Sequence, residues 1–339
     1  MDRHQIQQRT VATLMAANAF GYAGFVAIGA VAALLASEMT GNDSIAGIPA
    51  AAATLGTAAA AAPLAQRSKR LGRRMGIRRG YLIGAIGCGV AFAAGWAGVF
   101  PLLVVAMAAV GVGNASSLQN RFVAADLADE DKRARSIAMV VWVGTIGAVI
   151  GSPSALWANR LGTGLGLAEW VSPAVLGALG FGVAGIIINS ALRPDPLQVA
   201  GGIDPEAPRR NPIRGAAGTW RIVWPNLQAR LAIVAMAVSQ MAMVAVMTMT
   251  PLHMKDHGHA ELSTLVIAVH VLGMFGLAPL IGRWADRIGR IRAVQAGAVV
   301  LGVGTVAAVI AGYLPVMMFV GLFLLGVGWS VALIAGSAL

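Results

Sequence analysis

The chain has little charge for its length, and this shortage excludes a water-soluble fold. Only 12% of its 339 residues are Asp, Glu, Lys or Arg, whereas 58% are hydrophobic. A soluble globular chain carries about 25% charged and roughly 45–50% apolar residues. Half the usual charge leaves too little polar surface to cover a soluble fold. We therefore expect lipid to surround most of the chain.

Groups that could carry enzyme chemistry are also scarce. The single cysteine, Cys88, stands in an apolar run and has no partner for an intrachain disulfide. The apolar runs hold no constellation of protonatable or nucleophilic side chains, and no G-x-x-x-x-G-K-[ST] nucleotide loop occurs. His253 and His257 could share a helical face, but Lys255 and Gly258 beside them suit a metal site poorly. We expect no enzyme activity, no catalytic residue, no cofactor and no metal site.

Long apolar runs are what the chain has in plenty. A helix that crosses a hydrocarbon core of ~30 Å needs about 20 apolar residues, and its backbone must be hydrogen-bonded within the segment. Such runs lie at 11–36, 44–65, 80–99, 101–125, 136–158, 169–192, 229–252, 262–281, 293–313 and 315–339. None alternates as the strands of a membrane barrel do. The expected fold class is an all-α integral membrane bundle with about ten transmembrane helices.

Basic residues are distributed unevenly between the loops. With the N-terminus in the cytoplasm, only Arg160 and Lys255 of the 25 Lys and Arg residues fall outside. Cytoplasmic loops of membrane proteins carry such an excess. The net charge of +11 is then a topology signal, and we expect no nucleic-acid partner. The predicted location is the plasma or inner cell membrane, with a multi-pass chain and a cytoplasmic N-terminus.

A polar stretch and an internal repeat organise the chain. Residues 193–228, rich in Pro, Gly and Arg, predict a cytoplasmic linker between a six-helix unit at 1–192 and a unit of four helices at 229–339. The triplet at Ala62 recurs at Ala278, 216 residues later, and the Gly-Val-Gly triplet at Gly111 recurs at Gly326, 215 residues later. Two repeats related by an axis along the membrane normal are typical of one class of transporters.

The sharpest motif is the loop from Gly282 to Arg290. It fits the pattern G-x-x-x-D-R-x-G-R at every fixed position, namely Gly282, Asp286, Arg287, Gly289 and Arg290. Asp286 could accept hydrogen bonds from free amides at a helix N-terminus, or pair with Arg287 or Arg290. With this loop and the repeat, the chain resembles the major facilitator superfamily over its whole length. The resemblance implies a gating loop that locks two helices and releases them when they rock.

Two further motifs refine the resemblance. Aligned with the pattern, the first-half loop has Lys69 or Arg70 where the family has its acid. Residues Gly144 to Pro153 look like the G-x-x-x-G-P element of proton-coupled exporters, which are antiporters, with Ser152 inserted before the proline. Close packing by small residues four apart explains this element equally well. The interpretation is a drug-exporter-like member of the family.

The resemblance also implies that helices 1, 4, 7 and 10 line the central path. The candidates for substrate binding are Asn18, Tyr22 and Phe25 in the first span, Asn114 in the fourth, Gln240 in the seventh, Trp329 in the tenth, and Trp142 in the fifth. Each could instead be a contact between helices. Methionines near Gln240 suit an irregular, amphipathic ligand.

Proton coupling is left open by the sequence. No Asp or Glu stands at the centre of a predicted span, and many coupled members have an Arg where this chain has Met107. An ionisable residue inside the membrane is the usual candidate for a proton carrier. His270 is the one candidate here, and a hydrogen bond to a neighbouring helix is the alternative.

The sequence thus predicts a secondary active transporter that works by alternating access and exports an amphipathic small molecule. The alternatives are an importer or uniporter of a small metabolite and, from another class, a structural or enzymatic membrane protein. Expected partners are the small-molecule substrate, the bilayer and, under coupling, protons; the protein is expected to be a monomer. The repeat offset maps Leu339 onto Ala124, before helices 5 and 6 of the first unit. Two further helices are therefore expected beyond Leu339, and their absence is expected to leave the Asp286 loop without a partner.

Overall fold

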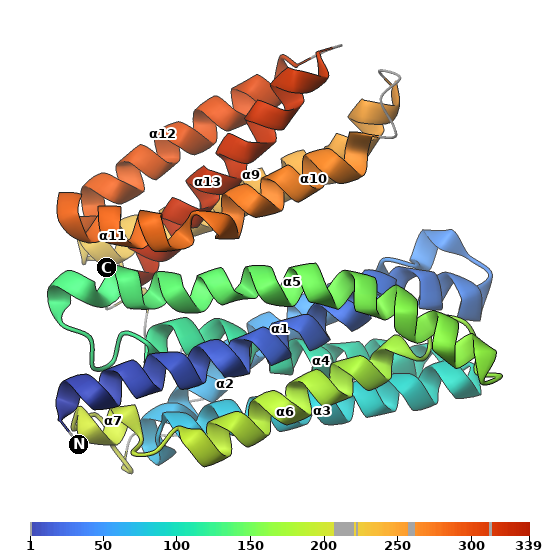
Figure 1. Ribbon diagram of the computed structural model, residues 1–339, viewed down its shortest axis with the longest axis horizontal. Coiled ribbons are helices and arrows are strands. Elements are labelled where there is room, and N and C mark those ends of the chain that lie inside the picture. Colours follow the sequence, from blue (N-terminus) through green and yellow to red (C-terminus); the bar gives the residue numbers. More distant parts are fainter. Residues whose placement is uncertain (1, 207–219, 222, 257–261, 312–313) are drawn as a thin grey trace. The chain divides into compact units, whose positions relative to one another are not determined.

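The computed structural model describes residues 2–206, 220–221, 223–256, 262–311 and 314–339 (Figure 1). Helices α1 (Arg3–Thr40), α2 (Ile48–Leu71), α3 (Arg73–Ala97), α4 (Phe100–Val123), α5 (Arg133–Gly164), α6 (Pro173–Ala191) and the short α7 (Pro196–Val199) come first. They are followed by α9 (Leu227–Asp256), α10 (Ser263–Val271), the π-helix η4 (Leu272–Gly276), α11 (Ala278–Ile288), α12 (Arg290–Val309) and α13 (Pro315–Ala338). Single 3₁₀ turns lie at Asp43–Ile45 and Glu130–Lys132. Within these ranges no strand occurs, so the all-α prediction is confirmed.

Most of the helices have the length and composition of membrane spans. Nine described helices are long and apolar enough to cross a bilayer, or ten if one bent pair is a single span. Large apolar side chains face outward on several of them, such as Trp96 at 71% exposure and Val316 at 74%. Exposed apolar side chains of this kind can pack against lipid tails, which agrees with the lipid environment that the low charge of the sequence predicts.

The bent pair replaces the straight eighth span predicted at 262–281. The segments Ala268–Gly276 and Ala278–Ile288 meet at 43°. The π-helical turn of η4 precedes the bend, and α11 begins with Pro279 in its first turn. A π-turn loosens the hydrogen-bond ladder, and proline lacks an amide hydrogen to continue it. A hydropathy pattern records only that the segment is apolar, so it cannot show this break.

Contacts divide the chain into two compact units, and α5 contributes to both. One unit comprises Met1–Leu127 with Ile146–Ile213, and the other comprises Ala128–Thr145 with Arg214–Leu339. We call them unit 1 and unit 2. The predicted boundaries at 192 and 229 leave all of α5 in the first unit, and that division stays a prediction.

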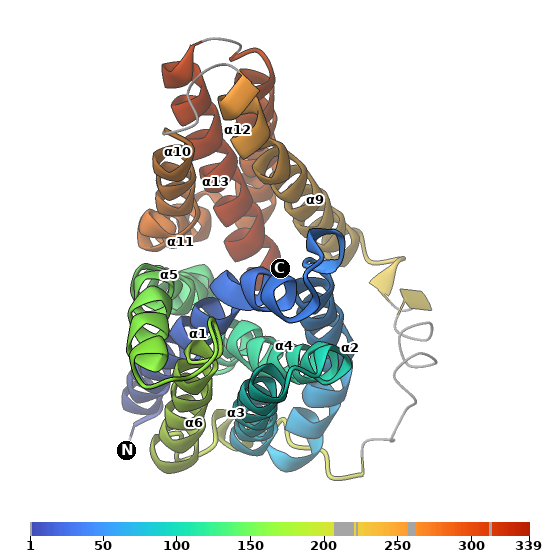
Figure 2. The same cartoon turned by 90° about the vertical axis from the view of Figure 1, so that its right-hand side faces the viewer.

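Unit 1 is packed through small residues. Helix α4 lies against α2 and α3, and α6 lies against α1 and α3, as Figures 1 and 2 show. A Cβ atom added at Gly84 would lie 2.7 Å from the Gly113 Cα, and one added at Gly24 would lie 3.0 Å from the Gly177 carbonyl oxygen. Glycine lets helix backbones approach this closely where lipid supplies no hydrophobic driving force.

Unit 2 is built around α13, which packs against α9, α10, η4, α11 and α12. Equivalent glycines of the internal repeat make equivalent close contacts between helices in the two units. A Cβ at Gly111 would overlap the Ala53 carbonyl oxygen of α2, and a Cβ at Gly326 would overlap the His270 carbonyl oxygen of α10. Each glycine thus permits the same close crossing, between helices 2 and 4 of unit 1 and between the corresponding helices of unit 2.

A second pair of glycines starts equivalent helices. Gly72 precedes α3 with φ 91° and ψ 159°, and Gly289 precedes α12 with φ 89° and ψ 140°. A positive φ of this kind is adopted readily by glycine alone. The two loops of the repeat therefore share one backbone turn, although only one of them holds the family's acid.

Candidate functional site

The Asp286 carboxylate caps the N-terminus of α5. Its Oδ1 accepts a hydrogen bond from the Ala134 amide at 3.1 Å, and its Oδ2 accepts one from the Arg135 amide at 2.9 Å. The first amides of a helix lack partners within the helix, and the helix dipole favours a negative charge there. Of the alternatives that the sequence left open, the helix N-terminus is the one observed. We call this contact the Asp286 cap.

The glycines and one arginine of the same loop make the cap possible. A Cβ at Gly282 would lie 2.6 Å from the Ala138 Cβ and 2.9 Å from the Ala134 carbonyl oxygen. Gly282 therefore lets α11 approach α5. Arg290 donates to the Glu130 carbonyl oxygen just before α5, whereas Arg287 is exposed. The expectation that the loop would lack a partner is wrong, because α5 supplies one within unit 2.

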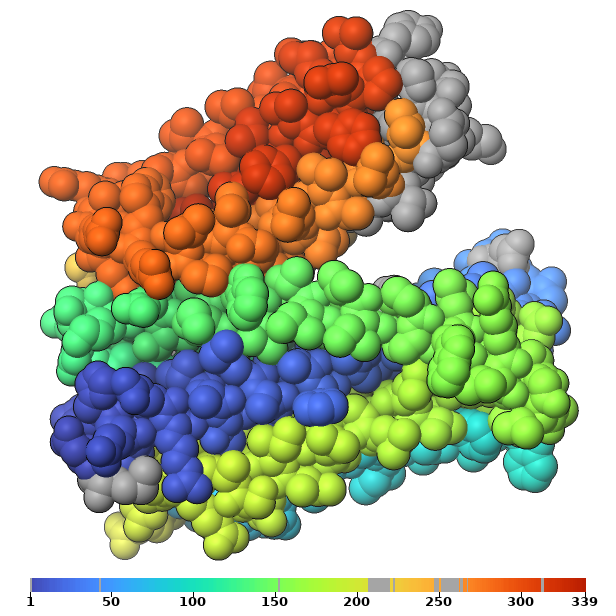
Figure 3. All heavy atoms as spheres, in the orientation of Figure 1, coloured from blue at the N-terminus to red at the C-terminus, as the bar shows by residue number. Residues whose placement is uncertain are grey.

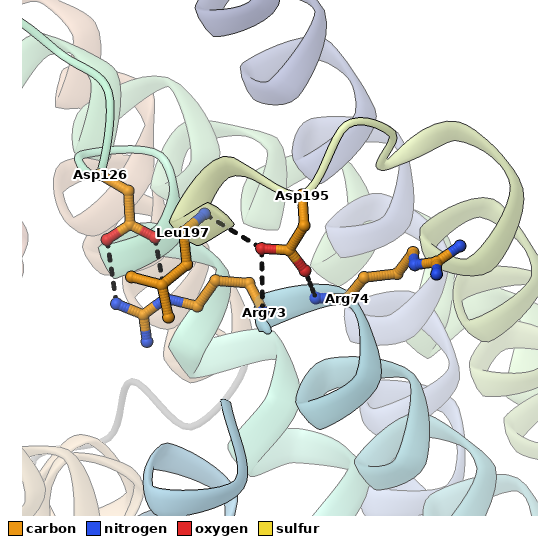
Figure 4. Close-up of polar contacts among 5 residues, drawn as sticks. All are labelled: Arg73, Arg74, Asp126, Asp195 and Leu197. Atoms are coloured by element: carbon orange, nitrogen blue, oxygen red, sulfur yellow. Dashed lines mark hydrogen bonds and ion pairs between the residues drawn. The ribbon is translucent and has the colours of Figure 1, made fainter. Parts of the chain in front are cut away.

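The first-half loop is capped by an acid from a distant part of the sequence (Figure 4). The Asp195 Oδ1 accepts hydrogen bonds from the amides of Arg73 at 3.2 Å and Leu197 at 3.0 Å, and its Oδ2 accepts from the Arg74 amide at 2.9 Å. Asp195 thus caps α3 and α7 together. Its carboxylate stands against Gly72, where a Cβ would overlap Oδ2.

An ion pair ties the same end of α3 to the chain after α4. The Arg73 guanidinium donates from Nε to the Asp126 Oδ2 at 2.8 Å and from Nη2 to Oδ1 at 2.9 Å. The two side chains are 20% and 12% exposed, so the pair is largely shielded from water. Sequence analysis missed both acids. The Asp195-Pro196 step, typical of a helix start, was the available signal for one of them.

Gln240 and Trp329 meet in unit 2. The Trp329 Nε1–H donates to the Gln240 Oε1 at 2.8 Å, which joins α9 to α13. The Phe275 ring of η4 stands edge-on to Trp329, with centroids 5.8 Å apart and planes at 79°. Trp329 is buried while Gln240 is exposed. An amide, an indole and a phenyl ring are thus held together, a combination that can contact a ligand with apolar and polar parts.

The three candidates on α1 lie on one face, as their spacing predicts. Asn18 is buried, and Tyr22 and Phe25 are half-buried. The two rings have their centroids 6.2 Å apart at an interplanar angle of 37°. The spacing of the three residues therefore produces one polar and aromatic strip on α1.

Asn114 forms a contact between helices. Its Nδ2 donates to the Thr57 Oγ1 of α2 at 3.4 Å. The Thr57 Oγ1 lies 2.9 Å from each of the carbonyl oxygens of Ala53 and Gly111, which share its single hydrogen. Thr57 had no place among the predicted residues. The Asn114 Oδ1 is buried and has no hydrogen-bond partner in the part of the chain that the structure describes. The contact between helices is therefore observed, and the substrate role of Asn114 stays a prediction.

Helix α5 carries Trp142 and the glycine-rich element. Trp142 is half-buried in the segment that belongs to unit 2. Further along, a Cβ at Gly147 would lie 2.9 Å from the Ala23 amide nitrogen of α1, and one at Gly151 would lie 2.7 Å from the Ala23 carbonyl oxygen. These glycines let α5 pack on α1, which is the role that small residues four apart predict.

His270 is fully buried on α10. Its Nδ1 lies 2.8 Å from the Leu322 carbonyl oxygen of α13. A carbonyl can only accept, so Nδ1 carries a hydrogen, and in the neutral ring Nε2 then holds a lone pair. Nε2 has no hydrogen-bond partner in the part of the chain that the structure describes. The predicted alternative, a histidine bonded to a neighbouring helix, is what the geometry shows; a proton-carrying role stays a prediction.

A buried polar group between α3 and α4 also escaped prediction. The Tyr81 hydroxyl accepts a hydrogen bond from the Asn120 Nδ2 at 2.7 Å and lies 3.3 Å from the Ser117 Oγ. Tyr81 is completely buried. Hydropathy places all three in spans, but only tertiary contacts show that they meet.

The outer loop with His253 and His257 adds nothing to the site. His257 lies outside the described residues, and so does the side chain of His253. Among the residues that are described, no group of three or more His, Cys, Asp or Glu side chains could hold a metal ion.

Apolar spans, two repeated units and charged caps at helix ends define a multi-pass helical membrane transporter. A family model of the Major Facilitator Superfamily matches residues 13–339. The chain is 35% identical over 339 residues to the uncharacterised MFS-type transporter YddS of Bacillus subtilis (strain 168), an alignment that covers 99% of this chain and 78% of the relative. The chain belongs to the major facilitator superfamily. It is a transporter of the membrane and not an enzyme.

A more distant relative and a solved structure agree with this assignment. The riboflavin transporter RfnT of Brucella anthropi is 26% identical over 98% of this chain and 80% of its own length. The crystal structure of the human organic anion transporter MFSD10 superposes with a TM-score of 0.70 at 13% identity, covering 98% of this chain and 85% of that one. That likeness shows the fold alone. The expectation of two helices beyond Leu339 stays a prediction.

Proposed function

We propose that the protein is a secondary active transporter that works by alternating access and exports an amphipathic small molecule. Family membership supports transport of a small molecule. The Asp286 cap supports alternating access, because hydrogen bonds between a loop and a helix end can break and re-form as helices rock. We further propose that the protein is a monomer in the plasma or inner membrane, in which the 193–228 linker joins a six-helix unit at 1–192 to a unit of four helices at 229–339.

The observation that carries the proposal is the group of Gln240, Trp329 and Phe275. In this family the seventh and tenth helices line the path, and the structure joins α9 to α13 through the Gln240–Trp329 bond. Two aromatic rings offer apolar surface, and the Gln240 amide offers a donor and an acceptor. A sugar would demand many more polar groups than this group provides. An amphipathic substrate fits it better.

Replacing Trp329 with Phe should lower the rate of substrate efflux by about fivefold, because one hydrogen bond of roughly 1 kcal/mol is lost while the aromatic surface stays. Gln240→Leu should have a similar effect. Efflux of ethidium and of rhodamine 6G from loaded cells, with and without a protonophore, measures it. Trp96→Phe is the control, since that indole is 71% exposed on α3 and belongs to unit 1. Equal efflux by all variants at matched expression would remove these residues from the substrate path.

The riboflavin transporter relative favours a second candidate, a carrier of a small planar metabolite. Riboflavin combines an aromatic ring system with polar edges, so the same group could contact it. The direction of transport distinguishes the exporter from the metabolite carrier. Uptake of labelled riboflavin into cells that express the protein, with no dye efflux, would favour the metabolite carrier over the exporter.

If transport is coupled to protons, His270→Asn should flatten the pH dependence of the transport rate. The Asn side-chain amide can still donate to the Leu322 carbonyl, so the folded protein should be retained while the titrating group is lost. His270→Ala removes both functions and should also lower the melting temperature. A pH profile of His270→Asn that matches the parent would leave His270 with a structural role only.

The N-terminus and the 193–228 linker should be cytoplasmic, and residue 257 should be outside. In a Cys88→Ala background, cysteines introduced at Asn211 and His257 test this with an impermeant maleimide. We expect labelling at 257 in intact cells and labelling at 211 only after the membrane is opened. Labelling of both positions in intact cells would overturn the orientation derived from the Lys and Arg distribution.

A further inference from the structure

We propose that unit 1 binds an anionic phospholipid of the inner leaflet, with its headgroup phosphate at the cytoplasmic ends of α3 and α6. Three arginines, the arginine cluster, gather there around Asn189. Arg78 donates from Nη1 to the Asn189 Oδ1 at 2.8 Å. Arg193 Nε and Arg74 Nη1 lie 3.3 Å and 3.5 Å from the Asn189 carbonyl oxygen. Three guanidinium groups therefore lie within reach of one uncharged residue.

No carboxylate neutralises this charge in the part of the chain that the structure describes. The ion pairs found there involve Arg73 and Lys132, and no member of the arginine cluster. Asp195 is nearby, but its oxygens accept hydrogen bonds from three backbone amides. Figure 4 shows the Arg74 guanidinium pointing away from that carboxylate. Like charges held so close repel one another, and a phosphate group is a partner that guanidinium groups bind with two parallel hydrogen bonds.

A hollow beside the cluster offers room for a headgroup. It has a volume of about 270 Å³ and is lined by Leu71, Arg74, Arg193, Pro194, Asp195, Gln198 and Ile203. Two arginines thus face one acid there, and the Asp195 carboxylate already accepts hydrogen bonds from three backbone amides. Basic pockets between helices on the cytoplasmic side are typical places for anionic headgroups.

Apolar surface continues from the cluster along both helices. Leu82 and Ile86 of α3 are 40% and 66% exposed, and Leu179 and Ile186 of α6 are 59% and 67% exposed. The two helices run side by side (Figure 1), and the outer surface of α6 follows the lower part of Figure 3 in yellow-green. Gly182 lies between Leu179 and Ile186 on α6, and a Cβ there would meet nothing within 4 Å, so this stretch of the surface is open. An acyl chain can lie there, which commits the site to a lipid and not to a free anion.

Native mass spectrometry of the purified protein with equal amounts of phosphatidylglycerol and phosphatidylcholine tests the proposal. The parent should retain phosphatidylglycerol about fivefold better than phosphatidylcholine. Arg74→Gln/Arg78→Gln/Arg193→Gln should lose this preference. The matched control, Arg3→Gln/Arg9→Gln/Arg67→Gln, removes the same charge from exposed positions on other helices and should keep it. Melting temperatures show whether each variant is folded.

Gly182→Leu tests whether the lipid acyl chain lies on this apolar face, and it leaves every arginine in place. It tests the proposed lipid site even if the triple variant does not fold. The added side chain should occupy the open space at this position and reduce phosphatidylglycerol retention about threefold. Equal retention by parent, triple variant and control would overturn the site. Displacement of the lipid by millimolar inorganic phosphate would also overturn it, since the site would then bind soluble anions without using the apolar face.

Discussion

Gly111→Ala should prevent unit 1 from packing and reduce the amount of folded protein about tenfold or more. The new Cβ would overlap the Ala53 carbonyl oxygen, and it would crowd the Thr57 amide nitrogen at 2.8 Å. Both are backbone atoms of α2, so no side chain can move aside. Overpacking of a core costs about 1–3 kcal/mol, and more where a backbone has to shift. The monodisperse fraction in detergent and its melting temperature measure the effect.

Gly89→Ala is the matched control for that experiment. Gly89 also lies inside a helix of unit 1, but an added Cβ would meet nothing within 4 Å there. Alanine is the better helix former by about 1 kcal/mol, so this variant should be as stable as the parent or slightly more so. Equal behaviour of the two variants would mean that α2 and α4 do not cross as closely as the structure shows.

Asp286→Asn should slow transport about tenfold while lowering the folded amount less than twofold. The loss of the charge weakens two hydrogen bonds to the first amides of α5, and bonds to charged groups contribute about 1.5–3 kcal/mol each. The amide can still accept one bond, so α5 keeps part of its cap. Initial transport rates at matched expression, with the substrate identified by the efflux assay, measure the change.

Asp129→Asn is the control for the Asp286 variant. Asp129 pairs with Lys132 at 2.9 Å, with both side chains more than half exposed, and such surface pairs contribute little. It should therefore transport at the parental rate. If Asp286→Asn did so too, the loop would be a topology signal and no gate.

Much of the fold could be predicted from the sequence because each segment that crosses lipid needs about 20 apolar residues in a helix. Every predicted span overlaps a described helix. The repeat offset pairs Gly111 with Gly326, and the structure places both at close helix crossings. Span ends were less accurate: α1 begins at Arg3, eight residues before the predicted run. Polar and charged residues such as Arg3 and Arg9 lower the local hydropathy, so a hydropathy pattern ends a span before the helix itself ends.

The contacts that cap the helices could be predicted only in part. The sequence left three possible partners for Asp286, since a short loop with several arginines permits them all. Asp195 could not be connected with Arg74 at all, because 121 positions separate them and no periodic pattern joins a linker to a helix start. The first-half loop has Lys69 or Arg70 where the family has its acid, and the fold brings in Asp195 from elsewhere to cap α3.

The backbone turns at Gly72 and Gly289 are nearly identical, so this chain contains the same turn twice in different surroundings. Both positions begin a helix with nearly the same dihedral angles, but they differ in their surroundings. Asp195 stands against Gly72, and nothing described lies within 4 Å of a Cβ at Gly289. The same substitution at both sites would therefore separate two quantities that are usually confounded. The loss of stability common to both variants reports the strain of the backbone turn. The difference between the two losses reports the additional cost of placing a side chain against a carboxylate.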